Sequence, residues 1–286
     1  MKNILVPTDF SATARNAVNY AIELAKIIKA EITLLHIFDV PVAITDVSVV
    51  MPSPSELEHV HKHMLNNYEK ELKGKTNNGV AIKGVVKMGY VFDEIKNAVR
   101  ENKIDLIVMG ITGAGKLTEL LIGSNATRVI KKIDCPTIVV PEKAKFVQLK
   151  KVAFACDYNG VEESKAVDQL VDFVKLLKAQ LVIVNIGKPT KVPAYSEDLS
   201  GKFLEYVFEN VDEFPDIPSD VDYSVYQQKD DDVVVGINRF VDKHGVDLLV
   251  MIPRKHSMLS SLFHESNTQR MAFHTHVPLL ALHEEH

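Results

Sequence analysis

The residues best suited to chemistry form the stretch GITGAGKLTELLIGS, residues 110–124. Its first seven residues have the G-x-x-x-x-G-K spacing of a phosphate-binding P-loop, in which the next residue is a Ser or Thr that holds Mg²⁺. Here that position is Leu117, and Thr118 lies one residue out of register. The stretch also follows the fourth expected strand, whereas a P-loop ordinarily joins a domain's first strand to its first helix. A working P-loop is therefore disfavoured.

A longer pattern in the same stretch fits a phosphate clamp: Gly110, two residues, Gly113, nine residues, then Gly123 and Ser124. Gly110 is expected to end a parallel strand, where open α/β sheets bind ligands. The absence of Cβ atoms lets the backbone approach a ligand closely. Gly123 and Ser124 start a helix whose free N–H groups suit a phosphate. Isolated glycines often only punctuate a chain, but the full spacing in this strand-to-helix context favours a nucleotide site.

Histidines and acidic runs offer weaker chemistry. His59 and His63 share a face of an expected helix and could bind zinc. No H-E-x-x-H motif or Cys partner accompanies them, so solvated or packed histidines are the better interpretation. Among the histidines late in the chain, His264 beside Glu265 is the best metal candidate. The acidic run at residues 229–236 fits a helix start, and no G-x-S-x-G elbow is present. We assign no catalytic residue and no metal ligand.

Composition places the chain among ordinary soluble proteins. Its 286 residues predict about two domains, and a net charge of -5 without a basic stripe argues against nucleic-acid or acidic-membrane partners. Apolar runs such as VDLLVMI are too short to cross a bilayer, and the N-terminus MKNILVPTDF does not resemble a signal peptide. Two widely spaced cysteines, Cys135 and Cys156, fit a reducing compartment. We expect a cytoplasmic protein.

The same order of segments occurs twice, which predicts a tandem duplication. KNILVPTDF from residue 2 resembles KKVAFACDY from residue 150, and AEITLLHI from residue 30 resembles AQLVIVNI from residue 179. KIDLIVMG from residue 103 and CPTIVVPE from residue 135 recur as GVDLLVMI from residue 245 and VPLLALHE from residue 277. We expect a first domain over residues 1–143 and a second over residues 150–286.

Strand and helix patterns alternate within each half. In the first half, short apolar runs at residues 3–9, 31–37, 80–86, 105–111 and 136–140 predict buried strands. Helices are expected after Ser11, which can cap the first of them, and at residues 55–75, 92–103 and 124–133. Strands that are apolar on both faces and alternate with helices indicate a parallel sheet covered on both sides. The predicted fold is α/β, with a five-stranded parallel sheet in each half.

These features resemble the universal stress protein family. The resemblance rests on the G-x2-G-x9-G-[S/T] spacing, the opening ILVPTDFS and the closing CPTIVVP, and it covers nearly the whole chain as two tandem domains. It implies a Rossmann-like sheet. In members with this glycine pattern, it also implies ATP or another adenine nucleotide bound at the loop, with Mg²⁺ as a candidate companion ion.

The resemblance also implies roles for residues of the first half. Residues that end the first two strands would contact the adenosine: Pro7, Thr8, Asp9 and Ile37. Residues of the fourth strand and the glycine loop would line the ribose and hold the phosphates: Met109, Gly110, Thr112, Gly113, Gly123, Ser124 and Asn125.

Several of these residues leave alternatives open. Many relatives carry a basic residue near Thr112 and a valine at the position of Asn125, which affects the nucleotide's identity more than the site's existence. Lys116 could supply charge to the outer phosphates or be a solvated loop lysine. Asp9 could bond the local backbone before the helix, a role compatible with a site.

The second half lacks the glycines. Aligning DLIVMG with DLLVMI places Ile252 opposite Gly110 and Lys255 opposite Gly113. Glu265 then falls where a phosphate would lie and would repel it. The remaining counterparts are Asp157 opposite Asp9, Ser266 opposite Ser124 and Asn267 opposite Asn125. We expect one nucleotide site per chain, in the first half.

The degenerate half is expected to serve as a packing partner. Universal stress proteins commonly pair through their last strands, and PTIVV and PLLAL could make that pseudo-dimer within one chain, since an uncovered apolar edge invites aggregation. Further pairing into a homodimer stays open. The functional hypotheses are a nucleotide-binding stress-response regulator, a slow ATPase or phosphotransferase using the same loop, and a scaffold with two vestigial sites. The sequence does not distinguish ATP from ADP, AMP or a cyclic dinucleotide.

Overall fold

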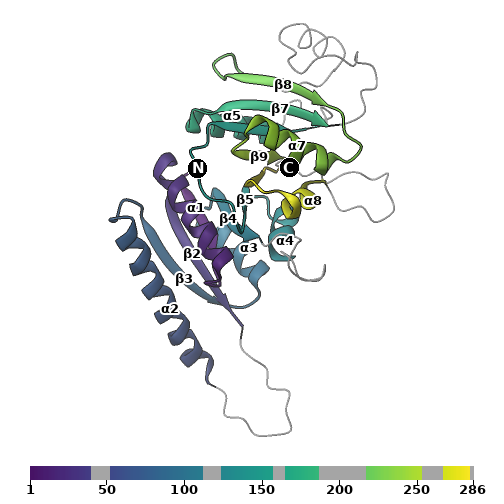
Figure 1. Cartoon of the computed structure of the whole chain (residues 1–286). Helices are drawn as coiled ribbons and strands as arrows, with labels where there is room; N and C mark the ends of the chain where they lie inside the picture. The colour runs from purple at the N-terminus through teal and green to yellow at the C-terminus, as the bar shows by residue number, and fades with distance from the viewer. Residues whose placement is uncertain (40–51, 112–123, 157–164, 187–216, 253–266, 284–286) are drawn as a thin grey trace, which may run out of the picture.

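The computed structural model describes residues 1–39, 52–111, 124–156, 165–186, 217–252 and 267–283, and these build one continuous sheet flanked by helices (Figure 1). The first half contributes β1 (Asn3–Pro7), α1 (Ala12–Ile28), β2 (Glu31–Phe38), α2 (Pro54–Lys75), β3 (Ile82–Met88), α3 (Val91–Glu101), β4 (Leu106–Ile111), α4 (Ser124–Lys132) and β5 (Thr137–Pro141). The second half contributes β6 (Lys151–Ala155), α5 (Lys165–Leu177), β7 (Gln180–Ile186), β8 (Tyr223–Gln228), α7 (Val233–His244), β9 (Leu248–Met251), α8 (Asn267–His274) and β10 (Leu279–Ala281).

The two halves share one topology and meet at their last strands. The strand order is β3-β2-β1-β4-β5-β10-β9-β6-β7-β8, and all pairs within each half are parallel. β5 and β10, which contain the two edges named from the sequence, pair antiparallel, with Leu280 opposite Ile138. The predicted fold class of two tandem five-stranded parallel domains is confirmed.

Matching hydrogen bonds mark the duplication. The Asp105 carboxylate accepts from the backbone N–H groups of Lys2 (2.6 Å) and Asn3 (2.9 Å). Asp247 accepts in the same way from residues 150 and 151, both at 2.9 Å. In each half, the residue before the fourth strand thus fixes the start of the first.

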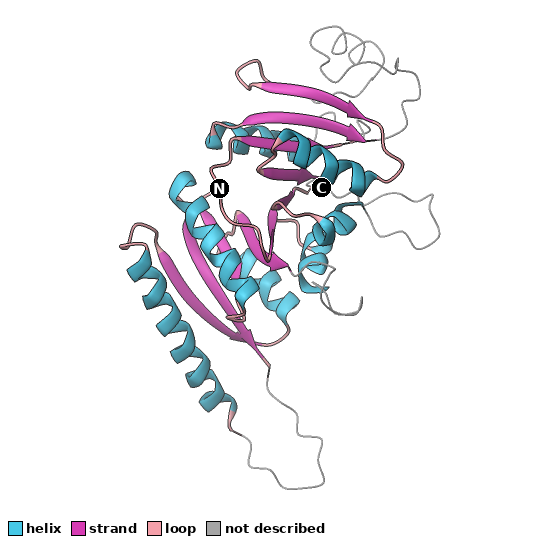
Figure 2. Cartoon of the chain, viewed as in Figure 1, coloured by secondary structure: helices cyan, strands magenta, loops and turns pink. Residues whose placement is uncertain are grey.

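Two apolar layers enclose the sheet. One packs α1, α2 and α5 on one face, and the other packs α3, α4, α7 and α8 on the opposite face (Figure 2). Alternate residues of a strand enter different layers: Ile4 and Val6 of β1 join the first, and Leu5 joins the second. This is the period of two expected for a strand covered on both sides.

Helix starts follow the local signals of the sequence. Ser11 caps α1 by accepting from the N–H of Ala14 at 3.2 Å, as predicted. Asp232 caps α7 by accepting from two backbone N–H groups at 2.8 and 3.1 Å, which gives the acidic run its structural role. α2 begins with a capping box between Ser53 and Glu56. These contacts fix where each helix leaves the sheet.

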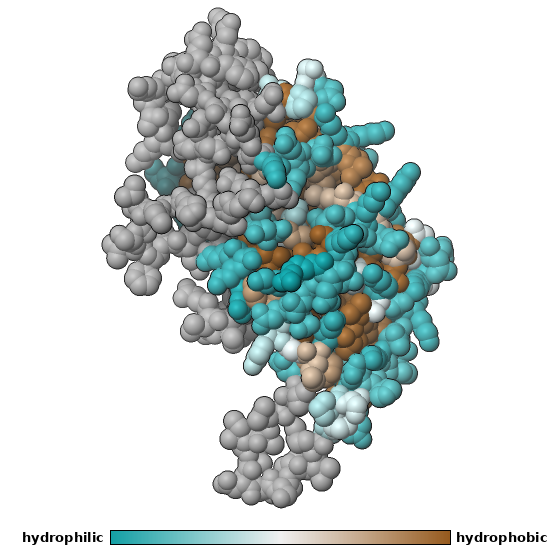
Figure 3. All heavy atoms as spheres, turned by 180° about the vertical axis from the view of Figure 1, so that it is seen from behind, coloured by the Kyte–Doolittle hydropathy of each residue, from teal (hydrophilic) through white to brown (hydrophobic). Residues whose placement is uncertain are grey.

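The described surface is mixed in hydropathy. From behind, hydrophilic side chains surround smaller apolar areas (Figure 3). None of the helices in the described ranges has the length and apolar character to cross a membrane. Cys135 and Cys156 form no disulfide, and burial raises the pKa of the Cys135 thiol to about 12. Cys135 therefore behaves as a small apolar residue.

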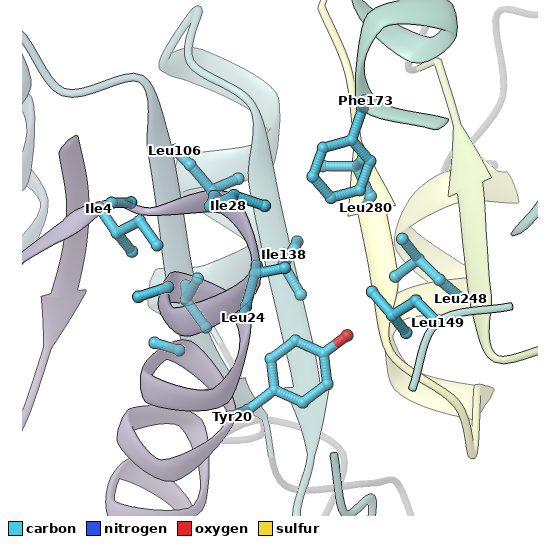
Figure 4. Packing of buried hydrophobic residues seen from close by; sticks show 14 of the residues in the cluster. Ile4, Tyr20, Leu24, Ile28, Leu106, Ile138, Leu149, Phe173, Leu248 and Leu280 are labelled. Carbon is cyan, nitrogen blue, oxygen red and sulfur yellow. The ribbon is translucent and has the colours of Figure 1, made fainter. Parts of the chain in front are cut away.

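The junction between the halves buries a tyrosine hydroxyl. Tyr20 points from α1 toward the second half (Figure 4), and its ring meets Phe146 edge-on at 5.0 Å. Only 2 % of Tyr20 is exposed, and its hydroxyl finds no hydrogen-bond partner among the described residues. Burial, and secondly the charge of Asp247, raise the pKa of this phenol. The hydroxyl is therefore a cost to stability.

We expect Tyr20→Phe to stabilise the protein by about 1 kcal/mol, because the variant keeps the ring contacts and removes a desolvated polar group. The free energy of unfolding in urea is the quantity to compare with wild type. A variant less stable than wild type would show that the hydroxyl has a partner in solution.

Candidate nucleotide site

A pocket opens where the first half of the sheet reverses its strand order. β1 has β2 on one side and β4 on the other, and a crevice forms at the carboxyl ends of strands at such a switch point. The cavity measures about 440 Å³, within the range of small-molecule sites. Its lining comes from the ends of β1, β2 and β4 and the starts of α1, α3 and α4: Pro7, Thr8, Asp9, Ser11, Thr13, Ala14, Leu35, Ile37, Val91, Met109, Gly110, Ile111, Asn125 and Ala126.

The pocket brings together seven of the twelve residues named from the sequence. These are Pro7, Thr8, Asp9, Ile37, Met109, Gly110 and Asn125. Ser124 begins α4, and only its place in the helix is described. The other four, Thr112, Gly113, Lys116 and Gly123, lie outside the described residues. The geometry thus unites the strand-end residues with the start of α4.

Seven lining residues were not named from the sequence. Leu35 could have been, because it lies two residues before Ile37 and so shares its side of the strand. Ser11, Thr13 and Ala14 form the start of α1, which follows β1 directly and faces the crevice. Val91 starts α3, and no local sequence pattern showed that it would line the pocket. The direction of a helix relative to a pocket depends on tertiary packing.

The β1–α1 turn holds its polar groups by local bonds. Thr8 Oγ1 accepts from the N–H of Phe10 at 3.1 Å, and Asp9 Oδ1 accepts from the N–H of Ser11 at 3.0 Å. The turn-residue interpretation of Asp9 is thereby confirmed, and its exposed side chain still lines the pocket. Phe10 has a φ of 62°, in the left-handed region that non-glycine residues seldom occupy. Such strain concentrates at functional sites.

Gly110 is required for helix packing. A Cβ built on Gly110 would lie 2.5 Å from the carbonyl oxygen of Thr13 and 2.7 Å from its Cγ2. The missing side chain therefore lets α1 start directly against β4. This is a different reason from ligand approach, which was the reason given from the sequence, although Gly110 also lines the pocket.

The model of the universal stress protein family matches this chain twice, over residues 1–141 and 148–283. The chain belongs to the universal stress protein family. A curated relative, universal stress protein Slr1230 of Synechocystis, is 25% identical over 98% of this chain and 99% of its own length. Universal stress protein MJ0577 of Methanocaldococcus jannaschii is 32% identical over 50% of this chain and 96% of its own length. A crystal structure of a universal stress protein from Archaeoglobus fulgidus has the same fold, with a TM-score of 0.70, 17% identity and coverage of 99% of this chain and 98% of that one.

The second universal stress protein domain keeps the frame of the pocket. Leu249 pairs with Leu279 as Ile107 pairs with Thr137, so Ile252 stands at the position of Gly110. Asn267 begins α8, the counterpart of α4. Asp157, Lys255, Glu265 and Ser266 lie outside the described residues. Loss of the second site therefore stays a prediction.

His63, one of the two helix histidines named from the sequence, makes a local contact. Asn67 Nδ2 bonds His63 Nε2 at 3.0 Å, one helical turn along α2. Within the described part of the chain, no three His, Cys, Asp or Glu side chains are grouped to hold a metal ion. His264 lies outside it.

Proposed function

We propose that this universal stress protein is a stress-response regulator that binds one adenine nucleotide in the pocket of its first half. The observation that carries the proposal is the convergence of residues from β1, β2, β4 and α4 on one cavity at the switch point of the sheet. Open α/β sheets bind nucleotides at such positions. The glycine spacing of the loop that joins β4 to α4 is the one associated with ATP in the family resemblance.

The pocket offers distinct surroundings to the two ends of a nucleotide. Leu35 and Ile37 of β2 supply an apolar wall for the base, and Met109 closes it from β4. Asp9, at the β1 end, would accept hydrogen bonds from the adenosine. Asn125, in the first turn of α4, lies where backbone N–H groups and the helix dipole favour phosphate.

We assign the phosphates to the glycine loop and the helix start. The residues proposed for this role are Thr112, Gly113, Lys116, Gly123, Ser124 and Asn125. Mg²⁺, if used, would be held mainly by the phosphates, because Leu117 occupies the position at which a P-loop has its metal-binding hydroxyl.

We propose that the second half acts as a permanent pseudo-dimer partner. Its β10 pairs with β5 and so covers the edge that a single five-stranded domain would expose. A two-domain chain of this kind needs no second copy to complete its sheet. Two cysteines that form no disulfide, together with the proposed nucleotide ligand, fit a cytoplasmic setting.

Displacement of a fluorescent ATP analogue by ATP, ADP, AMP, cyclic AMP and GTP tests the proposal. Each run is repeated without Mg²⁺, and the ATP runs are assayed afterwards for ADP. We expect adenine nucleotides to compete and GTP to compete poorly, with no steady ADP release. Steady ADP release would instead support the slow ATPase or phosphotransferase. The absence of competition by any adenine nucleotide would refute nucleotide binding and leave the scaffold hypothesis.

A further inference from the structure

Two histidines form a hydrogen-bonded pair beside the pocket. His36 of β2 is 6 % exposed, and its Nδ1 lies 2.8 Å from the carbonyl oxygen of Thr8. Its Nε2 lies 2.8 Å from Nδ1 of His61, which comes from α2. The His61 ring stacks on Phe38 at 4.4 Å between centroids. The pair thus joins α2 to the end of β1.

The pair also supports the strained turn that carries Asp9. The Phe10 ring packs on His36 at 4.5 Å and meets Tyr68 of α2 edge-on at 5.8 Å. Arg15 Nε donates to the Phe10 carbonyl at 3.2 Å. Phe10 holds a left-handed backbone, and such strain persists only where the surrounding contacts hold it. Without them, the turn would relax and carry Asp9 with it.

Helix α2 buries few of its residues against the rest of the protein. Of the 22 residues of this helix, the fully buried ones are Leu65, Tyr68 and Leu72. A helix held by few buried apolar contacts has a low free energy of local opening. The His36–His61 bond is one of the polar contacts that join α2 to the sheet, with a second between Glu69 and the N–H of Gly84 at 2.7 Å.

The proton count of the pair follows from its partners. A carbonyl only accepts, so His36 Nδ1–H donates to Thr8, and His36 Nε2 must accept from His61 Nδ1–H. One added proton can be shared without breaking the bridge. A second would leave N–H facing N–H and two like charges in contact. The docked pair therefore holds at most one added proton, whereas two free imidazoles would hold two.

The equivalent position of the second half carries an amide in place of an imidazole. Asn185 occupies the position of His36 and donates from Nδ2 to the carbonyl of Cys156, the counterpart of Thr8, at 2.9 Å. Gln227 of β8, the neighbouring strand, donates to Asn185 Oδ1 at 3.1 Å, so this link runs from strand to strand and not to a helix. Because neither amide titrates, protonation chemistry at this position belongs to the half that has the pocket.

We propose that the His36–His61 pair positions the β1–α1 turn and makes nucleotide binding weaken as the pair takes up protons. This rests on the nucleotide site proposed above. His36 and His61 are positioning residues: they act through Thr8 and Phe10 and do not line the pocket.

Several of the other charged groups near the pair form ion pairs with one another. Charged and titratable groups on the packed elements include Asp9, Arg15, Asp39, Glu58, His59, Lys62, His63, Tyr68, Glu69, Lys70 and Glu71. Arg15 pairs with Glu71 at 3.5 Å and lies over the Tyr68 ring, and Lys62 pairs with Glu58 at 2.6 Å. Burial raises the pKa of Tyr68 to about 12, so it stays neutral near pH 6.

The sign of the effect follows from proton linkage. Burial, and secondly His36, lower the pKa of His61 below its usual value of about 6.5. With α2 detached, the imidazoles bind more protons below that pH than when it is docked. Docking is therefore favoured above about pH 6.5 and weakens as the pH falls below it, by about tenfold per pH unit for each proton that the docked pair excludes.

The test compares ATP affinity at pH 7.5 and pH 5.5 by titration calorimetry. Wild type is compared with a variant that has amides in place of both imidazoles, His36→Asn with His61→Gln, and with His63→Gln as a matched control on α2. Protonation of ATP itself is common to all three proteins. We expect the loss of affinity on acidification to be about fivefold to tenfold greater in wild type and His63→Gln than in the amide variant. Equal losses in all three would overturn the proposal.

Histidine NMR in the nucleotide-free protein gives a readout that does not depend on ATP. We expect the imidazoles of His36 and His61 to take up fewer than two protons between pH 7.5 and pH 5.5, and to shift together. Separate uptake of one proton by each of the two rings would overturn the proposal even if ATP binds. A wild type that binds no ATP at pH 7.5 but shows the coupled titration would refute the nucleotide site and leave the proton-sensitive link of α2.

Discussion

Replacing Gly110 by valine is expected to lower nucleotide affinity by about tenfold to a hundredfold and to destabilise the protein. A Cβ at this position would lie 2.5 Å from the backbone of Thr13, so α1 must move away from β4. Overpacking of this kind costs about 1–3 kcal/mol, and a movement of α1 displaces the β1–α1 turn that lines the pocket. Calorimetry gives the affinity, and urea unfolding gives the stability.

Gly74→Ala is the matched control for this substitution. Gly74 lies in α2, and a Cβ there meets nothing within 4 Å. We expect unchanged affinity and a stability gain of up to about 1 kcal/mol, because alanine is a better helix former. Wild-type affinity in the Gly110→Val protein would show that neither α1 nor the end of β4 shapes the binding site.

Replacing Leu280 by aspartate is expected to cost about 4 kcal/mol or more and to disrupt the union of the halves. Leu280 is fully buried at the centre of β10, opposite Ile138 of β5 and Val250 of β9. A carboxylate there has no cationic partner along these strands, and unpaired buried charges are among the most destabilising changes. Urea unfolding reports the loss, and size-exclusion chromatography reports association through the uncovered β5 edge.

The conservative change Leu280→Met controls for altered packing and is expected to cost less than about 1.5 kcal/mol. A Leu280→Asp protein that stays monomeric and unfolds within about 1 kcal/mol of wild type would contradict a buried β5–β10 junction.

Much of the fold can be predicted from local sequence patterns. Apolar runs such as NILVP give the strands, Ser11 gives the start of α1, and the repeated Asp105 and Asp247 mark equivalent positions in the two halves. The register of β5 against β10 was not accessible, because both strands are buried at every residue and no period of two distinguishes one pairing from the next.

The pocket residues at strand ends were predictable from the sequence. Those placed by the packing of helices against the sheet were less so. Pro7, Asp9 and Ile37 were named from the family resemblance, and their place in the pocket agrees with the rule that ligands bind at the carboxyl ends of parallel strands. Val91 and the packing role of Gly110 depend on how helices lie against the sheet. The His36–His61 contact joins residues 25 apart in sequence through the placement of α2, which no local pattern specifies.

The most direct test of the central account is the stoichiometry of ATP binding to the full chain, measured by titration calorimetry at pH 7.5 with Mg²⁺. The account predicts one ATP per chain, bound in the first half beside β1, β2 and β4. Two ATP molecules per chain would contradict the loss of the second site, and no binding at all would contradict the assignment of the pocket to an adenine nucleotide.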